Sequence, residues 1–457
     1  MKTRLETWKP VLTGDLAAEA VRVARSVSAR LRSRSTVMRA VEATRTQSAY
    51  PRLLPWIPYS VAQGHSGLAL LWSYLDSCFP GEGWDIKGKE ELEVAVRGAE
   101  ACGRLPLSLF SGSSGLAFAA WQSSRGGRRY RRLLAQLDRH IVPETIAIAE
   151  TLRQQSEGVN VGDFDAISGL SGVGVYLLCR RDQSLAAEAL RATLTAVVSL
   201  IRENDDGIPR WYTPPHLLYD DEIRSAYPHG NLNLGLAHGV PAMVALLALC
   251  KKEGMATEGL SQALEHAADW IREKQLGDEW GVNWPTALQL EEADTPNGKA
   301  LRVAASASAV YGTSRCAWCY GAPGIARALW LAGEALDRED YRELAISAME
   351  AVFRRPIAQR SIPSPTFCHG VAGLLQIVLR FANDTGRPVF VEEGRRLTEQ
   401  LLGRYSPDFM LGFRNLEVED REVDQPGLLD GAPGVALVLM AAATHVEPTW
   451  DRLFLLS

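Results

Sequence analysis

A short motif, Gly-x-x-Gly followed by a run of apolar residues, recurs along almost the whole chain and restricts its fold more than any other feature. Copies begin at Gly64, Gly112, Gly169, Gly239, Gly321, Gly370 and Gly431, and Ala242 replaces the second glycine of the fourth copy. The first glycines are between 48 and 82 residues apart. A unit that persists while its spacing varies is typical of one supersecondary motif with variable loops, and not of a strict solenoid.

Each motif leads into a segment that is apolar on nearly every face, such as Leu68–Trp72 or Val435–Met440. A helix of this kind must be covered on all sides. Between the motifs lie amphipathic stretches with apolar residues at helical spacing, as outer helices should have: Ala17–Leu31, Glu90–Cys102, Tyr130–Leu152, Leu185–Arg202, Leu260–Lys274, Tyr341–Arg354 and Val391–Leu402. The alternation predicts an all-α fold, a double-layered α/α toroid of seven inner and seven outer helices, as a single domain over residues 1–457.

The glycines have a backbone role in this prediction. We expect the first to adopt a positive φ in the turn, and the second to let the inner helix start close to its neighbour. If every inner helix begins at such a motif, the seven turns open at the same end of the ring. Reactive side chains in these turns would then share one mouth.

Composition narrows the class of protein. The 49 Lys and Arg against 54 Asp and Glu give a net charge of −5, which argues against a general nucleic-acid binder. Seven scattered cysteines do not form a disulfide framework. The N-terminal sequence lacks the pattern of a secretory signal, and no segment offers roughly 18 clean apolar residues. We therefore expect a cytoplasmic protein without a transmembrane segment.

Three potential metal ligands occupy equivalent positions in two consecutive motifs. Cys319 and Cys368 each lie two residues before the first glycine of their copy, and His369 follows Cys368. Two thiolates and one imidazole leave a fourth tetrahedral position open, as in catalytic zinc sites. The alternative, that a buried cysteine is only a small apolar residue, suits Cys78, Cys102, Cys179 and Cys250. A redox pair of Cys316 and Cys319 is disfavoured because no thioredoxin-like pattern surrounds it.

Further polar residues precede the same turns. His238 lies directly before the glycine of the fourth copy, which makes it a better candidate than His229, although a core histidine is an alternative. Asp165 lies four residues before Gly169, and Arg315 four residues before Cys319. Tyr320 follows Cys319, and Asp430 precedes Gly431, at the position that His238 and His369 hold in their own copies.

Together these motifs resemble the lanthionine synthetase C-like (LanC) cyclases. The resemblance covers about Gly64 to Gly434 and rests on four segments: Asp165–Gly172, Asn233–Gly239, Arg315–Gly324 and Cys368–Gly373. It implies an α/α toroid that binds Zn²⁺ and joins cysteine thiols of a dehydrated precursor peptide to dehydroalanine or dehydrobutyrine. The products would be lanthionine or methyllanthionine rings of a lantibiotic.

The resemblance also implies a role for each candidate. Cys319, Cys368 and His369 would be the zinc ligands, and the open position would take the substrate thiol. A free thiol has a pKa of about 8.5, whereas a metal-bound thiol is deprotonated at neutral pH. His238 would be the acid or base, Asp165 would orient His238 or Arg315, and Arg315 would stabilise the enolate or hold the histidine.

Because seven motifs fill the chain, we expect a stand-alone cyclase. It would work with a separate dehydratase and an export transporter. Any association of the cyclase with the membrane would be through a complex with these partners. Three alternatives stay open. One is a LanC-like protein that handles glutathione or dehydroamino acids, and another is a non-catalytic peptide-binding scaffold. An α/α-barrel glycosidase using Asp165 and Asp430 would leave the two cysteines and the histidine unexplained.

Overall fold

The computed structural model describes residues 8–52, 55–295, 298–304 and 314–457. Their contacts divide the chain into two compact units. Unit 1 comprises Met1–Pro106, Phe110–Leu134 and Ser361–Arg452, and unit 2 comprises Leu107–Leu109, Ala135–Arg360 and Leu453–Ser457. The expectation of a single domain stays a prediction.

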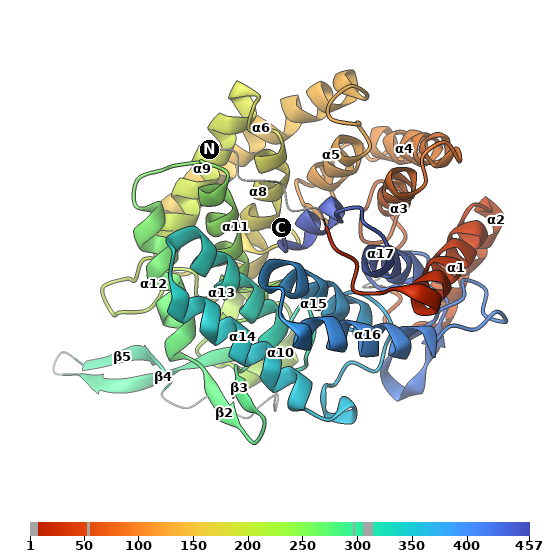
Figure 1. Ribbon diagram of the computed structural model, residues 1–457. Helices are drawn as coiled ribbons and strands as arrows, with labels where there is room; N and C mark the ends of the chain where they lie inside the picture. The colour runs from red at the N-terminus through yellow and green to blue at the C-terminus, as the bar shows by residue number, and fades with distance from the viewer. Residues whose placement is uncertain (1–7, 53–54, 296–297, 305–313) are drawn as a thin grey trace. The chain divides into compact units, whose positions relative to one another are not determined.

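Unit 1 is built of paired helices, with α3 packed on α4, α15 on α16 and α1 on α17, while α17 also contacts α3 and α15 (Figure 1). Its helices are α1 (Gly14–Leu31), α2 (Arg34–Gln47), α3 (His65–Cys78), α4 (Trp84–Ala101), α5 (Ser113–Gln122), α15 (Val371–Thr385), α16 (Pro388–Leu402) and α17 (Ala432–Ala443). A small antiparallel pair, β6 (Asn415–Leu416) and β7 (Glu422–Val423), completes it.

Unit 2 repeats the arrangement, with α8 packed on α9, α11 on α12 and α13 on α14, while α11 contacts α8 and α13. Its helices are α6 (Arg131–Gln154, with its first turn in unit 1), α7 (Val161–Phe164), α8 (Leu170–Cys179), α9 (Ser184–Ile201), α10 (Asp221–Ala226), α11 (Val240–Lys252), α12 (Leu260–Glu273), α13 (Ala322–Leu336) and α14 (Glu339–Arg354).

Two small antiparallel sheets belong to unit 2. One has the order β1 (Asn231–Asn233), β4 (Ala287–Thr295), β5 (Gly298–Val303), and the other pairs β2 (Leu276–Asp278) with β3 (Gly281–Asn283). The β4–β5 hairpin extends away from the helices of this unit (Figure 1). These strands interrupt the repeat only where the spacing between motifs is longest.

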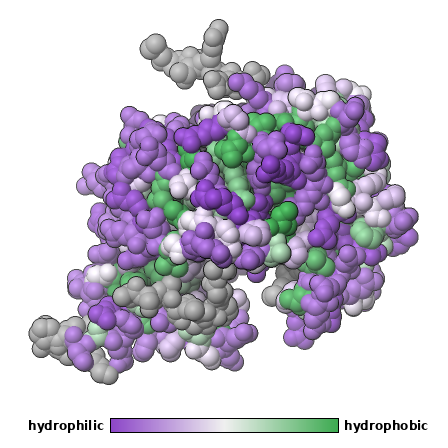
Figure 2. Space-filling model, turned by 60° about the horizontal axis from the view of Figure 1, so that its bottom comes forward, coloured by the Kyte–Doolittle hydropathy of each residue, from purple (hydrophilic) through white to green (hydrophobic). Residues whose placement is uncertain are grey.

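The predicted inner and outer helices are confirmed among the described residues. Each of the seven motifs is followed by an inner helix that starts one residue after the first glycine: α3, α5, α8, α11, α13, α15 and α17. Every residue of α8 is buried, whereas α4 buries only a stripe of its surface. The polar faces of the outer helices agree with Figure 2, in which hydrophilic residues cover most of the visible face.

The expected positive φ of the first glycines is wrong except at Gly321, whose φ is 100°. At Gly64 φ is −175°, which is extended backbone open to any residue. Glycine is required there because a Cβ would lie 2.0 Å from the carbonyl oxygen of Ile57. The turn folds back so tightly that side-chain volume, and not the sign of φ, selects glycine.

The expectation for the second glycine holds. A Cβ at Gly172 would lie 3.0 Å from Cβ of Leu109, three residues before the first glycine of the preceding copy. At Gly324 the same contact, with Leu236, would be 2.8 Å. At the fourth copy the corresponding residue of the preceding copy is the small Ala166, and the motif carries Ala242 in place of the second glycine.

One helix of the described chain, α9, is long and apolar enough to cross a membrane by length and composition alone. Its sequence includes Glu188 and Arg191, and 61% of the apolar window is buried within the protein. Helices that are mostly buried by packing against other helices meet the same criterion.

Candidate functional site

Backbone hydrogen bonds join the turns that precede consecutive inner helices. In unit 2, the amide of Ala166 donates to Ala237 O at 3.0 Å, and the amide of Ala237 donates to Cys319 O at 3.2 Å. In unit 1, Cys368 donates to Leu429 O at 3.0 Å, and Leu429 to Ala62 O at 3.3 Å. All but Ala166 lie two residues before their first glycine. The repeat thus brings equivalent positions side by side within each unit.

In unit 2 this arrangement places His238 against Asp165. Nδ1 of His238 donates to Oδ2 of Asp165 at 2.7 Å, and the carboxylate is almost fully buried. Oδ1 of Asp165 accepts the amides of Ser168, at 2.7 Å, and Gly169, at 2.9 Å. The carboxylate is therefore fixed by its own turn, and it fixes the imidazole so that Nε2 is the ring nitrogen left for chemistry.

The charge of Asp165 dominates the electrostatics of the histidine. Burial lowers the pKa of His238, but the hydrogen bond and charge of Asp165, with a smaller contribution from Cys319, raise it above its ordinary value. The side chain is 37% exposed, so the ring is reachable from outside. The protonated form of His238 therefore persists to higher pH than that of a free histidine.

Tyr320 packs beside this pair. Its ring centroid is 6.1 Å from that of His238, and its hydroxyl accepts a hydrogen bond from Nδ2 of Asn233 at 3.0 Å. A Cβ on Gly235 would come within 2.6 Å of the Tyr320 ring, so glycine is needed for this approach. Burial raises the pKa of Tyr320, and its hydroxyl stays protonated.

The remaining predicted residues of unit 2 differ in their surroundings. Cys319 is buried at the turn before α13. Arg315 is exposed, and among the described residues its side chain has no hydrogen bond or ion pair. Burial raises the pKa of the Cys316 thiol to about 11, and neither Cys316 nor Cys319 is in a disulfide. A thiol of such high pKa is poorly suited to redox exchange.

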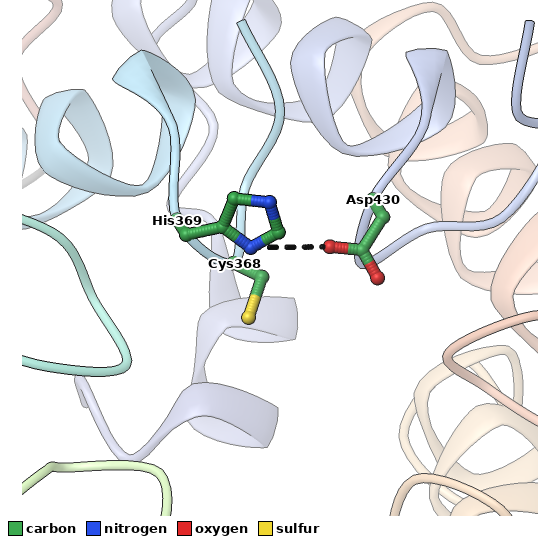
Figure 3. A group of neighbouring side chains, drawn as sticks. All are labelled: Cys368, His369 and Asp430. Carbon is green, nitrogen blue, oxygen red and sulfur yellow. Dashed lines mark ion pairs between the residues drawn. The ribbon is translucent and has the colours of Figure 1, made fainter. Parts of the chain in front are cut away.

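In unit 1 the turns bring together Cys368, His369 and Asp430. One donor atom from each lies within 4.8 Å of the other two (Figure 3). Nδ1 of His369 faces Oδ1 of Asp430 at 3.6 Å, and the imidazole is 32% exposed. The sequence predicts that Asp430 lies in the turn before an inner helix, and the structure shows that it lies beside Cys368 and His369. The signal available in the sequence was its location one residue before a first glycine, as for His369.

Asp430 is buried and only partly satisfied. Its Oδ2 accepts a hydrogen bond from Nε2 of Gln63 at 3.4 Å, whereas its Oδ1 has no hydrogen-bond partner among the described residues. Burial raises the pKa of Asp430, and His369 and Gln63 oppose the rise. A Cβ on Gly427 would lie 1.8 Å from Oε1 of Gln63, so this glycine makes room for the amide.

The donor set suits a soft divalent ion. Thiolate and imidazole are the preferred ligands of zinc, and a buried carboxylate oxygen without a partner is costly unless a cation or donor meets it. Gln63 also lines a cavity of about 250 Å³, together with Thr44, Arg45, Trp56 and several prolines.

Two tryptophans in the long spans before Gly239 and Gly321 are packed within unit 2. Trp211 and Trp284 are almost fully buried, and the indole of Trp284 donates to Ile271 O at 2.8 Å. Trp211 contacts Phe164 and Trp270 edge to face. They belong to the core of unit 2.

Three comparisons relate the chain to known proteins. Residues 55–455 match the family model described as Lanthionine synthetase C-like protein. The chain is 27% identical over 405 residues to Nisin biosynthesis protein NisC of Lactococcus lactis subsp. lactis, covering 87% of this chain and 88% of that protein. A solved structure named Nisin cyclase superimposes with a TM-score of 0.73 at 25% identity, covering 92% of this chain and 95% of that one. The likeness confirms the all-α class and the α/α toroid fold expected from the repeats. The chain belongs to the lanthionine synthetase C-like family.

Proposed function

We propose that this protein is a zinc-dependent lanthipeptide cyclase. Its substrate would be a dehydrated precursor peptide, in which a cysteine thiol adds to the β-carbon of dehydroalanine or dehydrobutyrine. The observation that carries the proposal is the pairing of His238 with Asp165, at 2.7 Å, in a chain that also places Cys368 and His369 together. The similarity to NisC and nisin cyclase supports the same chemistry.

The ligands would be Cys319, Cys368 and His369, which hold equivalent positions before two consecutive inner helices. Bound zinc would lower the pKa of the substrate thiol so that it is a thiolate at neutral pH. The turns supply rigidity, because each is tied by backbone hydrogen bonds to a neighbouring turn of its unit. Rigid placement of the donors keeps the thiol and the alkene in reacting geometry.

Residues of unit 2 would deliver the proton that completes the addition. Addition of sulfur to the β-carbon leaves a carbanion at Cα, delocalised as an enolate, and one proton must be delivered there. His238 would deliver it from Nε2, because Nδ1 is engaged with Asp165. Asp165 would stabilise the imidazolium and fix its orientation. Arg315, exposed at the same turn as Cys319, would contact the enolate oxygen or the peptide backbone.

Cysteine variants and His238→Ala test the proposal through two separate readouts. Purified protein is expected to hold about one zinc, and Cys319→Ala or Cys368→Ala to lose it. Cys316→Ala is the matched control and should keep both zinc and activity, because Cys316 lies in the same turn but its thiol has a pKa of about 11. His238→Ala should keep zinc and lose cyclisation by at least about a hundredfold, measured as free thiols remaining in a dehydrated peptide.

Two outcomes contradict the proposal. Folded wild-type protein without zinc would remove the metal chemistry, and undiminished cyclisation in His238→Ala would remove the proton donor. Binding of the dehydrated peptide with no ring formation above the spontaneous rate would favour the scaffold. Addition of small thiols alone would favour the glutathione alternative. We further propose that a separate dehydratase supplies the substrate in the cytoplasm and that an export transporter takes the product.

A further inference from the structure

Helix α2 and the segment that follows it form a basic surface of unit 1 with a cavity beside it. The helix lies at the outside of the unit, next to α1 (Figure 1). We propose that this surface binds an extended peptide segment in which carboxylates flank one bulky apolar side chain. The carboxylates would contact arginines of α2, and the apolar side chain would occupy the cavity. The inference goes beyond the proposed function, because neither the metal donors nor the proton donor take part in it.

The charge of this stretch is opposite to that of the whole chain. Residues 30–52 include six arginines and one acidic residue, Glu42, in a chain whose net charge is −5. Among the described residues, Arg34 and Arg39 are exposed and have no hydrogen bond or ion pair. Guanidinium groups without a partner attract carboxylates and bind them through paired N–H donors. The other arginines of the stretch are Arg30, Arg32, Arg45 and Arg52.

The face of α2 that borders the cavity carries two of these arginines. Arg34, Val41 and Arg45 project in nearly the same direction, because seven and eleven residues correspond to about two and three helical turns. Val41 and Arg45 line the cavity, so Arg34 lies on the same side of the helix. Arg34 and Arg45 are about 16 Å apart along the helix axis, a distance that about five residues of extended peptide span. Arg39 projects about 140° away from Arg34, on another face.

The cavity has a volume of about 250 Å³. Its walls include Val41 and Thr44 of α2, and Pro55, Trp56 and Pro426 from other segments of unit 1. This volume is below the roughly 300–1,000 Å³ of pockets for drug-sized ligands, and it suits a single bulky side chain. Rigid aromatic walls are typical of grooves that bind peptides, because they lose little conformational freedom on binding.

Trp56 is a fixed wall of this cavity. Its ring meets that of His65 edge to face, with 5.3 Å between the centroids. Glu91 of α4 holds His65 in turn, with 2.6 Å between Oε2 of the carboxylate and Nδ1 of the imidazole, and both side chains are buried. Because the wall is in place before a ligand arrives, binding would require little ordering of the protein.

Arg45 can exchange its present partner for a carboxylate of the peptide. Its guanidinium pairs with Glu42, three residues earlier on α2, at 2.6 Å, and both side chains are mostly exposed. An exposed ion pair of this kind contributes little to stability, so its replacement has a small cost. Since Arg45 also lines the cavity, it would hold a carboxylate close to the buried apolar side chain.

A peptide suits this surface better than an anionic membrane does. Helices that lie on membranes insert an apolar face into the lipid, whereas Val37, Ala40 and Thr44 of α2 are buried in the protein. Among the large apolar side chains of α2, all of whose residues the structure describes, only Met38 is exposed. A cavity for a side chain would also have no role on a surface that is attracted to lipid by charge alone.

Fluorescence anisotropy with a labelled synthetic heptapeptide tests the inference. The peptide has a central leucine with three glutamates on each side, and the purified full-length chain is titrated into it at an ionic strength of about 0.15 M, where the Debye length is about 8 Å. Binding should weaken at least about fivefold in Arg34→Glu and in Arg45→Glu, because each reverses a charge beside the cavity. Replacing the leucine of the peptide by alanine should weaken binding to wild type about tenfold, since less apolar surface is buried.

Arg39→Glu is the matched control. It makes the same change of charge on the same helix, but on the face that projects away from the cavity, and its charge is screened from the bound peptide. The affinity of this variant should stay within about twofold of wild type. Circular dichroism establishes that the three variants are folded, and Arg34→Gln or Arg45→Gln replaces a charge-reversal variant that is not.

Three results would overturn the inference. The first is no binding of the heptapeptide to wild-type protein, and the second is equal weakening by Arg34→Glu, Arg45→Glu and Arg39→Glu, which would indicate attraction by charge without a defined groove. The third is wild-type protein that sediments with phosphatidylglycerol vesicles but does not bind the peptide. None of these measurements involves zinc or ring formation, so each of these results would leave the proposed function intact.

Discussion

At the scale of single residues, the candidate chemistry depends on side chains that neighbouring groups hold in place by hydrogen bonds. Asp165 is held by two backbone amides of its own turn and in turn holds His238. Asp430 is held by Gln63, for which Gly427 leaves room. Each functional group therefore has one engaged atom and one presented atom, which sets its direction before any substrate arrives.

The raised pKa of His238 predicts a pH dependence. If His238 donates the proton, activity should fall as the pH rises through the pKa of its imidazole. Asp165→Asn removes the negative charge that raises this pKa, so the falling limb should move to lower pH. Among the described residues, burial lowers this pKa and Cys319 adds to the rise caused by Asp165, and the ring of Tyr320 packs nearby.

Two measurements check this prediction: the pH profile of cyclisation, and the imidazole titration followed by NMR. Asp163→Asn is the control, because Asp163 is also a partly buried carboxyl, in α7 just before Asp165, and no hydrogen bond or ion pair joins it to His238 among the described residues. The pair also favours the folded state below the unfolded pKa of histidine, near 6.5, and this contribution disappears as the pH rises through the folded value. An unchanged pH profile in Asp165→Asn would contradict the assignment.

At the scale of elements, the repeat is a turn and an inner helix whose glycines let the chain pack against itself and its neighbour. A Cβ at the second glycine would lie 2.2 Å from Val61 O at Gly67, and 2.3 Å from Leu428 O at Gly434. In these two copies, and in those of Gly172 and Gly324, the clashing carbonyl belongs to the residue six positions earlier. The tight turn thus requires the glycines of the motif, whether or not the turn also carries catalytic residues.

Gly172→Ala tests this packing. Its Cβ would lie 2.2 Å from Ala166 O and 3.0 Å from Cβ of Leu109, both part of the packed interior of unit 2. We expect the free energy of unfolding to fall by about 1–3 kcal/mol, as for other overpacked cores. Ala242→Gly, at the same position of the fourth copy, should cost only about 1 kcal/mol. Urea unfolding of the two variants gives the comparison, and equal losses would contradict the packing argument.

At the scale of the whole molecule, both ends of the described chain are fastened to inner helices far away in sequence. The indole of Trp8 donates to Ala441 O in α17 at 2.9 Å, within unit 1. Within unit 2, the indole of Trp318 donates to Phe454 O at 2.9 Å, and the buried guanidinium of Arg327 donates to Leu456 O. Local sequence around these residues gives no sign of such contacts.

Phe454→Ala should weaken unit 2 through its loss of packing. The ring is fully buried and meets Trp318 edge to face, with 5.0 Å between centroids. Removing a buried phenylalanine ring costs about 3–5 kcal/mol. Leu185→Ala, on the exposed side of α9, should change the free energy of unfolding by less than about 0.5 kcal/mol. Thermal unfolding distinguishes them, and a Phe454→Ala protein as stable as the Leu185→Ala control would contradict the role of the C-terminal segment.

Most of the helices, and the turns that carry the candidate site residues, could be predicted from the sequence. The amphipathic stretch predicted at Tyr341–Arg354 is α14, Glu339–Arg354, and all seven inner helices start where the motif places them. The sequence prediction of a positive φ at the first glycine of each motif was wrong except at Gly321. The sequence shows that a side chain is excluded at this position, but it does not show whether the backbone angle or the lack of space excludes it. The partnership of Asp165 with His238 was one of two alternatives, and only coordinates distinguish them.

The sequence by itself determined the class of fold, the positions of the turns and the types of side chain that each turn carries. These depend on short-range periodicity and on the repetition of one motif, both of which can be read along the chain. Tertiary structure alone decided which atoms face one another: Nδ1 of His238 toward Asp165, and Oδ1 of Asp430 toward His369 without a hydrogen bond. Those directions follow from how backbone amides of separate repeats bond to each other, and that pairing is set by packing between residues far apart in sequence.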